Sequence, residues 1–176
     1  MPAMDMDEEK VVSLYEDMRH LANVAVWAVD LQIKRLETNE PEFADFPFQP
    51  LVDFHFLVTA LTRLQEIAEA LKAIEDMEPV MEKAIESFEK EVPGLRDIRN
   101  VLEHIGEYAR GAGHDQDVQY GEMFTVVLDS DCIQWLGYEL RPRAALSASD
   151  TLFHVIKENP PAAYVRAVDS QRSKNR

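Results

Sequence analysis

The hydrophobic positions in the first part of the chain recur at steps of three and four residues, which is the spacing of an amphipathic helix. Residues 7–38 carry this pattern without an internal glycine or proline. The pattern returns over residues 51–77, and Pro50 stands where a helix tolerates proline in its first turn. The sequence therefore predicts two long helices joined by a loop over residues 39–50, whose phenylalanines we expect to cover the edge of the core.

Two further helices are predicted in the middle of the chain. The third begins at Pro79 and is stopped by Pro93-Gly94. The fourth covers residues 95–110 and ends at the glycine-containing sequence 111–113. The expected core face of this fourth helix consists of Ile98, Val101, Leu102, Ile105 and Ala109.

The residue pattern then changes to β-branched and aromatic side chains. Segments 123–128 and 132–136 are separated by Asp129-Ser130-Asp131, which predicts a β-hairpin. Ser147 is expected to open a last short helix that Pro160-Pro161 ends.

These elements predict a mainly α protein. We expect an antiparallel four- to five-helix bundle followed by the hairpin and the short helix. A length of 176 residues suits a single domain. Within it we expect a bundle core over residues 7–113, an extension over 117–160 and a frayed tail over 168–176.

Composition and charge narrow the class of protein. Cys132 is the only cysteine, so an internal disulfide is excluded. The longest apolar run, residues 24–29, is far below the roughly 20 residues of a membrane helix, and an acidic N-terminal sequence is unlike a targeting signal. We therefore expect a cytoplasmic protein.

The net charge of −15 argues at first against nucleic-acid binding. The acidic residues are concentrated before residue 140, however, and residues 141–176 carry 7 basic and 3 acidic residues.

Candidate chemistry is concentrated on the fourth predicted helix. Asn100 and His104 are four residues apart and share a face, so the amide can orient the imidazole. Arg99 and Glu103 have the same spacing and can pair. Arg99 and His104 are separated by about 140° around the helix and roughly 7.5 Å along it. If both act on one substrate, two copies of this helix must meet, which predicts a homodimer with a shared cleft.

The sequence Arg99-Asn100-Val101-Leu102-Glu103-His104 resembles the R-x4-H motif of HEPN-domain proteins. Its place on a late helix after two long helices also resembles that family, and the resemblance covers residues 7–113. It implies a metal-independent endoribonuclease, often a toxin of toxin–antitoxin or other defence systems, that acts as a homodimer on RNA and is neutralised by an antitoxin protein.

The resemblance also assigns roles to residues, with no metal and no cofactor required. His104 would transfer protons, Arg99 would clamp phosphate oxygens, and Asn100 would position His104 or the phosphate. RNA supplies its own 2′-hydroxyl as the nucleophile, so the expected product is a 2′,3′-cyclic phosphate. The expected substrate-binding residues are Arg96, Glu103 and Arg110; Glu103 would either hold Arg99 or balance its charge.

Other interpretations of the same residues stay open. The chain is alternatively a non-catalytic dimeric helical module that binds a partner protein, or an acidic mimic of nucleic acid. Among the other histidines, only His114 is placed where it could reach a phosphate. Cys132 is expected in the core rather than as a nucleophile. Trp27 and Trp135 are also expected in the core, although either could anchor an interface.

Overall fold

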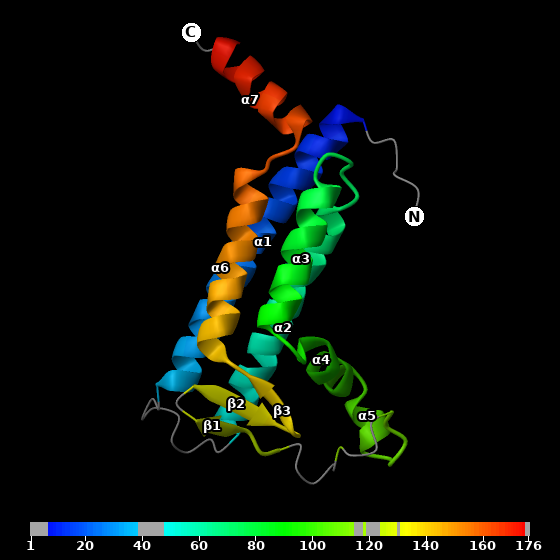
Figure 1. The fold of residues 1–176 in the computed structure, drawn as a ribbon, viewed down its shortest axis with the longest axis vertical. Helices are drawn as coiled ribbons and strands as arrows, with labels where there is room; N and C mark the ends of the chain where they lie inside the picture. Colours follow the sequence, from blue (N-terminus) through cyan, green and yellow to red (C-terminus); the bar gives the residue numbers. More distant parts are fainter. Residues whose placement is uncertain (1–6, 39–47, 115–117, 119–123, 130, 175–176) are drawn as a thin grey trace.

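The computed structural model describes residues 7–38, 48–114, 118, 124–129 and 131–174 of the chain. Its longest helices lie side by side (Figure 1); they are α1 (Glu8–Glu37), α2 (Gln49–Leu71), α3 (Glu78–Glu91) and α6 (Pro142–Glu158). Near one end of these helices lie α4 (Leu95–Glu103), α5 (Ile105–Tyr108) and a small sheet, and α7 (Ala162–Lys174) extends from the other end. The prediction of a mainly helical protein is confirmed.

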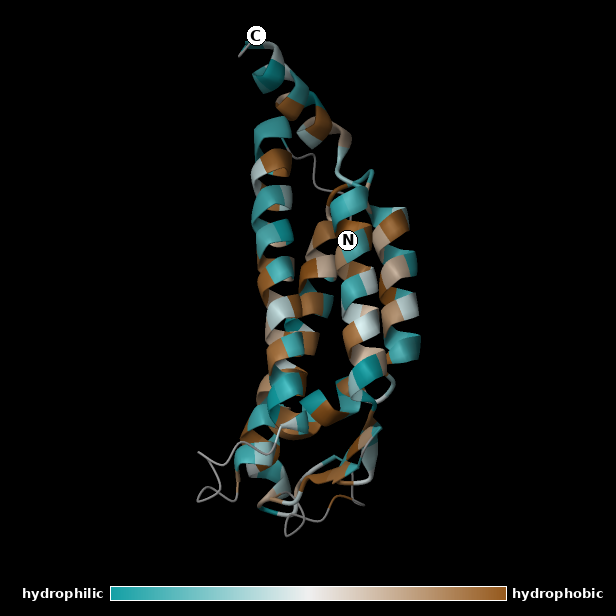
Figure 2. Ribbon diagram, turned by 90° about the vertical axis from the view of Figure 1, so that its left-hand side faces the viewer, coloured by the Kyte–Doolittle hydropathy of each residue, from teal (hydrophilic) through white to brown (hydrophobic). Residues whose placement is uncertain are grey.

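The long helices are amphipathic, and Figure 2 shows hydrophobic and hydrophilic residues alternating along them. The side chain of Asp7 caps α1 by accepting a hydrogen bond from the Glu9 backbone amide at 3.3 Å. Leu57, Leu61 and Leu64 of α2 are fully buried, and burying each leucine contributes about 1.5–3 kcal/mol to folding. Hydrophobic burial therefore packs α2 against α1, α3 and α4.

An ion pair between Arg35 of α1 and a buried carboxylate of α2 aligns these two helices along their length. These two helices run in opposite directions (Figure 1). The carboxylate of Asp53 on α2 is 3% exposed and lies 2.8 Å from Nε of Arg35 on α1. Gln49 donates a further hydrogen bond to it at 3.3 Å. A buried carboxylate is costly unless it is paired, so these contacts keep Arg35 and Asp53 at the same level.

Polar contacts also attach α6 and α7 to the other helices. The hydroxyl of Tyr15 on α1 donates a hydrogen bond to the backbone oxygen of Ile156 on α6 at 3.1 Å. The ring of Tyr164 on α7 packs 4.8 Å from the Tyr15 ring. The backbone amide of Ala162 donates to Asp76 at 2.7 Å, which satisfies a donor at the start of α7.

The sheet is antiparallel and has the strand order β1 (Val127–Asp129), β2 (Cys132–Trp135) and β3 (Tyr138–Leu140). The predicted hairpin is confirmed as the β1–β2 pair, in which Val127 lies opposite Gln134. The third strand was not predicted. It follows a two-residue turn in which Leu136 and Gly137 both have positive φ, 53° and 83°, as a type I′ hairpin turn requires.

Two helix boundaries differ from the predicted ones. The second helix ends at Leu71, and residues 72–77 form turns rather than continuing to Met77. The helix expected to open at Ser147 begins at Pro142, because a proline fits the first turn and leaves no unsatisfied donor.

The C-terminal segment corrects another expectation. Pro160 and Pro161 do end α6, but α7 starts directly after them and continues to Lys174. Residues 168–174 are therefore helical rather than frayed, and residues 175–176 lie outside the described part. The expectation for loop residues 39–47 also lies outside it. In the part of the chain that the structure describes, no helix is long and apolar enough to cross a membrane.

Candidate functional site

The candidate site is built on α4, which packs against α2. Gly94 precedes α4 with φ of 80°, a left-handed conformation that lets the chain turn sharply out of α3. Leu95, Ile98 and Val101 form the buried face of α4. Because this face is anchored in the core, the polar residues between its members are held on the outer surface of α4.

The predicted fourth helix is interrupted at His104. This residue has φ of −105° and ψ of 20°, so the helical direction changes between α4 and α5. The predicted core face is consequently wrong beyond this point: Ile105 is 39% exposed and Ala109 is exposed. Tyr108 is buried instead. His104 itself is exposed, as is Asn100 one turn before it.

An open cavity of about 750 Å³ lies beside this break. Its lining includes Asn100, His104, Glu107, His114 and Tyr138. Asn100 and His104 thus share one cavity, as their spacing predicts. Nδ1 of the His104 ring lies 3.3 Å from Oε1 of Glu107, so a carboxylate rather than the predicted amide is positioned to orient the imidazole.

Asp97 and Tyr138 also line this cavity, but neither belongs to the R-x4-H motif. Asp97 lies one turn before Asn100 in the first turn of α4. Acidic residues are common in the first turn of a helix, so its type alone did not indicate a site. Tyr138 comes from β3, a strand that was not predicted. Only the packing of the sheet end of the molecule brings Tyr138 next to α4.

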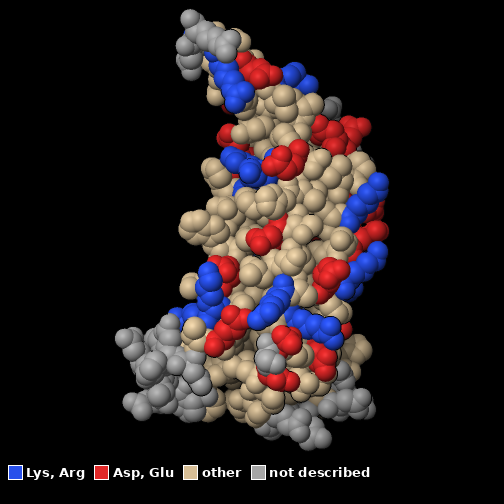
Figure 3. Space-filling view, turned by 60° about the vertical axis from the view of Figure 1, so that its left-hand side comes forward, with Lys and Arg blue, Asp and Glu red and all other residues tan. Residues whose placement is uncertain are grey.

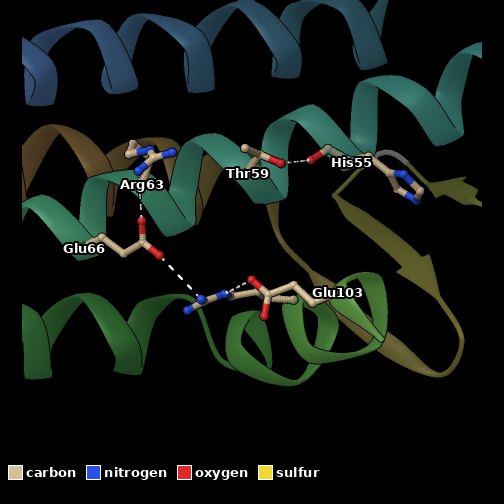
Figure 4. Close-up of polar contacts among 6 residues, drawn as sticks. His55, Thr59, Arg63, Glu66 and Glu103 are labelled. Carbon is tan, nitrogen blue, oxygen red and sulfur yellow. Dashed lines mark hydrogen bonds and ion pairs between the residues drawn. The ribbon is translucent and has the colours of Figure 1, made fainter. Parts of the chain in front are cut away.

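Arg99 points into a different, smaller cavity of about 170 Å³ between α2 and α4. Its Nε lies 2.8 Å from Oε1 of Glu103, as the four-residue spacing predicts. A second guanidinium nitrogen lies 3.5 Å from Glu66 of α2. Arg63 contacts the same Glu66 at 3.3 Å, and Figure 4 shows this chain of contacts across α2 and α4.

These contacts stabilise the charged form of Arg99. The hydrogen bond to Glu103, with the negative charges of Glu103 and Glu66, raises the pKa of the guanidinium above its ordinary value. Arg99 therefore stays a cation, but two carboxylates in the same chain compete with any phosphate for it. Glu66 was not found from the sequence because it belongs to another helix.

Arg99 and His104 thus occupy separate cavities of one chain. The other two arginines expected to bind substrate, Arg96 and Arg110, are exposed and line neither cavity. Figure 3 shows acidic and basic side chains interspersed over one face of the molecule, without a continuous basic field. Around Arg99 itself the charges are mixed, since Glu66 and Glu103 lie beside Arg63 and Arg99.

The described residues offer little support for a metal site or for a reactive cysteine. Among the described residues there is no group of three or more His, Cys, Asp or Glu side chains that could hold a metal ion. Burial, with the negative charge of Glu139, raises the pKa of the Cys132 thiol and keeps it in the unreactive protonated form.

A second cavity of about 850 Å³ lies between α3 and α6. Apolar side chains such as Phe88 and Leu152 contribute to its lining, and no histidine does. The cavity beside α4, with two imidazoles, is therefore the better candidate for acid–base chemistry.

Comparisons with protein-family models, with curated proteins and with solved structures found no match for this chain. The resemblance to HEPN proteins consequently rests on residues 99–104 and their helical setting.

Proposed function

We propose that the chain is a metal-independent endoribonuclease of the HEPN type that uses the cavity beside α4. The observation that carries this proposal is the presence of His104, His114 and Asn100 around one open cavity. Two imidazoles at one site are suited to proton transfer near neutral pH, because the ordinary pKa of histidine lies there.

The proposed reaction uses the nucleophile that RNA already contains. One imidazole takes the proton of the 2′-hydroxyl, and the 2′-oxygen forms a bond to phosphorus. The bond from phosphorus to the 5′-oxygen breaks, and the other imidazole donates a proton to that oxygen. The products are a 2′,3′-cyclic phosphate and a 5′-hydroxyl end.

Glu107 and Asn100 have separate roles around the imidazole of His104. Glu107 accepts a hydrogen bond from Nδ1 of His104, which leaves Nε2 of that ring for the substrate. The amide of Asn100 is placed to donate to a phosphate oxygen or to position His104. Both contacts orient the reacting groups rather than supply the proton themselves.

Arg99 belongs to this site only in a dimer. Within one chain it is held by Glu66 and Glu103 and faces away from the cavity of His104. In a homodimer whose α4 helices meet, Arg99 of one copy would instead stabilise the phosphorane charge beside His104 of the other. Arg96 and Arg110, both exposed, would flank the bound RNA.

Cleavage of single-stranded RNA in EDTA tests the proposal. Wild type is expected to cleave, whereas His104→Ala and Arg99→Ala each lose at least about 100-fold in rate, the usual contribution of a proton-transferring or charge-stabilising group. His154→Ala, which alters an exposed histidine of α6, is the matched control and should retain full activity. Equal cleavage by all four proteins would identify a contaminating nuclease and refute the proposal.

A non-catalytic interaction module is the alternative function. It is favoured by the two carboxylates on Arg99, since they occupy Nε and one terminal nitrogen of the guanidinium and compete with phosphate for this cation in the single chain. In a toxin–antitoxin setting such a module would bind a partner protein. Wild type that forms dimers but leaves RNA intact in the same assay would support this alternative.

A further inference from the structure

The proposed reaction uses the two imidazoles of the cavity beside α4, together with Glu107 and Asn100. Asp97 and Tyr138 line the same cavity and have no role in that reaction. Asp97 comes from the first turn of α4, and Tyr138 comes from β3. Their position relative to the imidazoles indicates which part of an RNA molecule they meet.

The residue spacing on α4 places Asp97 on the same side of the helix as His104. Asp97, Val101 and His104 are separated by steps of four and three residues, so they follow one side of α4. All three line the larger cavity, whereas Arg99 and Glu103 line the smaller one. Asp97 and His104 are seven residues apart, about 10.5 Å along the helix. The carboxylate and the imidazole therefore lie toward opposite ends of one cavity.

The ring of Tyr138 lies at the end of the cavity where α4 begins. A β-carbon at Gly94 would be 4.0 Å from Cδ1 of Tyr138, so this ring packs close to the backbone before α4. Gly94 precedes Asp97 by three residues and His104 by ten. Tyr138 is therefore near Asp97 rather than near the imidazole of His104.

The second imidazole lies at the other end of the cavity. A side chain at residue 113 would overlap the ring of Tyr108, so the backbone of Gly113 packs directly against α5. His114 follows Gly113 and is thereby held on the side of α5 and His104. One nucleotide can span such a cavity, with its ribose and 3′-phosphate at the imidazoles and its base toward Asp97.

The chemistry of a carboxylate selects one of the four bases. The Asp97 side chain is exposed, and within the described part of the chain it has no ion pair or hydrogen bond. A carboxylate offers two acceptor oxygens and no donor. Guanine presents two adjacent donors on its Watson–Crick edge, N1–H and the N2 amino group. Adenine and cytosine present a donor beside an acceptor, and uracil presents one donor between two acceptors, so only guanine forms a bidentate pair.

An aromatic ring beside that carboxylate supplies the other contact that a base needs. Unpaired bases of RNA are bound by stacking on aromatic side chains and by hydrogen bonds to their edges. Stacking favours all four bases, because each has a π-face. Tyr138 would therefore contribute affinity, and Asp97 would contribute selectivity. A base is uncharged, so it tolerates the carboxylate where a phosphate would be repelled.

We propose that Asp97 and Tyr138 form a subsite for guanine. Tyr138 stacks on the base, and Asp97 accepts hydrogen bonds from N1–H and from the N2 amino group. The subsite rests on the proposed function, because it orients the nucleotide whose 2′-hydroxyl reacts at the imidazoles. RNA is then cleaved on the 3′ side of guanine, and the product ends in guanosine 2′,3′-cyclic phosphate.

Calorimetric titration with guanosine 3′-monophosphate tests the subsite without any cleavage. Wild type is expected to bind this nucleotide at least about 10-fold more tightly than adenosine 3′-monophosphate, which is the discrimination of a good bidentate pair. Asp97→Asn should remove the preference, because an amide replaces one acceptor by a donor. Asp150→Asn, which alters an exposed aspartate of α6, is the matched control and should keep the preference.

Substitutions of Tyr138 test the stacking contact. Tyr138→Ala should weaken the binding of both nucleotides by at least about 5-fold, because stacking does not depend on the base. Tyr138→Phe keeps the ring and should bind both nucleotides as wild type does. Circular dichroism of the two variants checks the fold, since Tyr138 also packs against the core. Equal weakening by both variants would exclude stacking on this ring.

Cleavage of an RNA that contains all four bases separates the subsite from the proposed function. New ends that follow guanine at least about 10-fold more often than other bases, with the preference lost in Asp97→Asn, would support the subsite. Cleavage without base preference would overturn the subsite and leave the endoribonuclease standing. A preference for guanosine 3′-monophosphate with intact RNA would refute cleavage but support the guanine subsite. Absence of binding by either nucleotide at millimolar concentration would overturn the subsite.

Discussion

His55 illustrates how burial changes the properties of a single side chain. The ring is half-buried beside Phe54 and Trp135, and its Nε2 atom is buried without a hydrogen-bond partner among the described residues. Burial lowers the pKa of His55 from its ordinary value. Figure 4 places it on α2 beyond Thr59, so this histidine packs against the sheet rather than joining the Arg99 contacts.

The lowered pKa of His55 predicts a loss of stability in acid. The unfolded chain takes up the proton first as the pH falls below about 6.5, while the folded chain resists protonation. The contribution is therefore fully present above that pH and is lost as the pH decreases. Urea unfolding at pH 7.5 and pH 5.0 should show a smaller loss for His55→Phe than for wild type. Equal losses in the two proteins would contradict this account.

Arg99 and His104 show which contacts of single residues could be predicted from the sequence. The Arg99–Glu103 pair follows from a four-residue spacing on one helix and is present. The partner of His104 was predicted to be Asn100, but Glu107, three residues further along the chain, lies at Nδ1 instead. Helical spacing identifies which side chains can meet, but not which of several candidates does.

At the scale of elements, the turn between β2 and β3 explains why the third strand was missed. The usual sequence signal for a two-residue hairpin turn is Asn-Gly or Asp-Gly, because both residues need positive φ. Here the first position is Leu136, which adopts φ of 53° while its side chain packs against the core. Only Gly137 fits the turn by its intrinsic preference.

Gly137 is therefore expected to be intolerant of substitution. Gly137→Ala should lower the free energy of unfolding by about 1–2 kcal/mol, the cost of a β-carbon in the left-handed region. Gly106→Ala is the matched control, because Gly106 lies in α5 with open space around its Cα and without positive φ. It should be neutral or stabilising by up to about 1 kcal/mol. Urea denaturation of both variants provides the measurement, and similar effects at both glycines would rule out backbone strain at Gly137.

The whole molecule carries a net charge of −15, and this value affects its association with other molecules. Copies of the chain repel each other at long range. RNA is also negative, so non-specific binding is expected to be weak, and approach is expected to favour the local cations near α4.

The amino-acid sequence by itself determined the mainly helical class, the two long amphipathic helices, the β1–β2 hairpin and the polar residues of α4. These features depend on local periodicity and on proline and glycine positions, which act over a few residues. The third strand, α7 and the break at His104 depend on turns and packing that local patterns do not contain.

Only the tertiary structure decided which side chains share a site. It placed Tyr138 and His114 around the same cavity as His104, and Glu66 beside Arg99. It also left Trp27 exposed, although a tryptophan was expected to pack in the core. Contacts between residues distant in the chain arise from the packing of whole elements, so no local pattern could identify them.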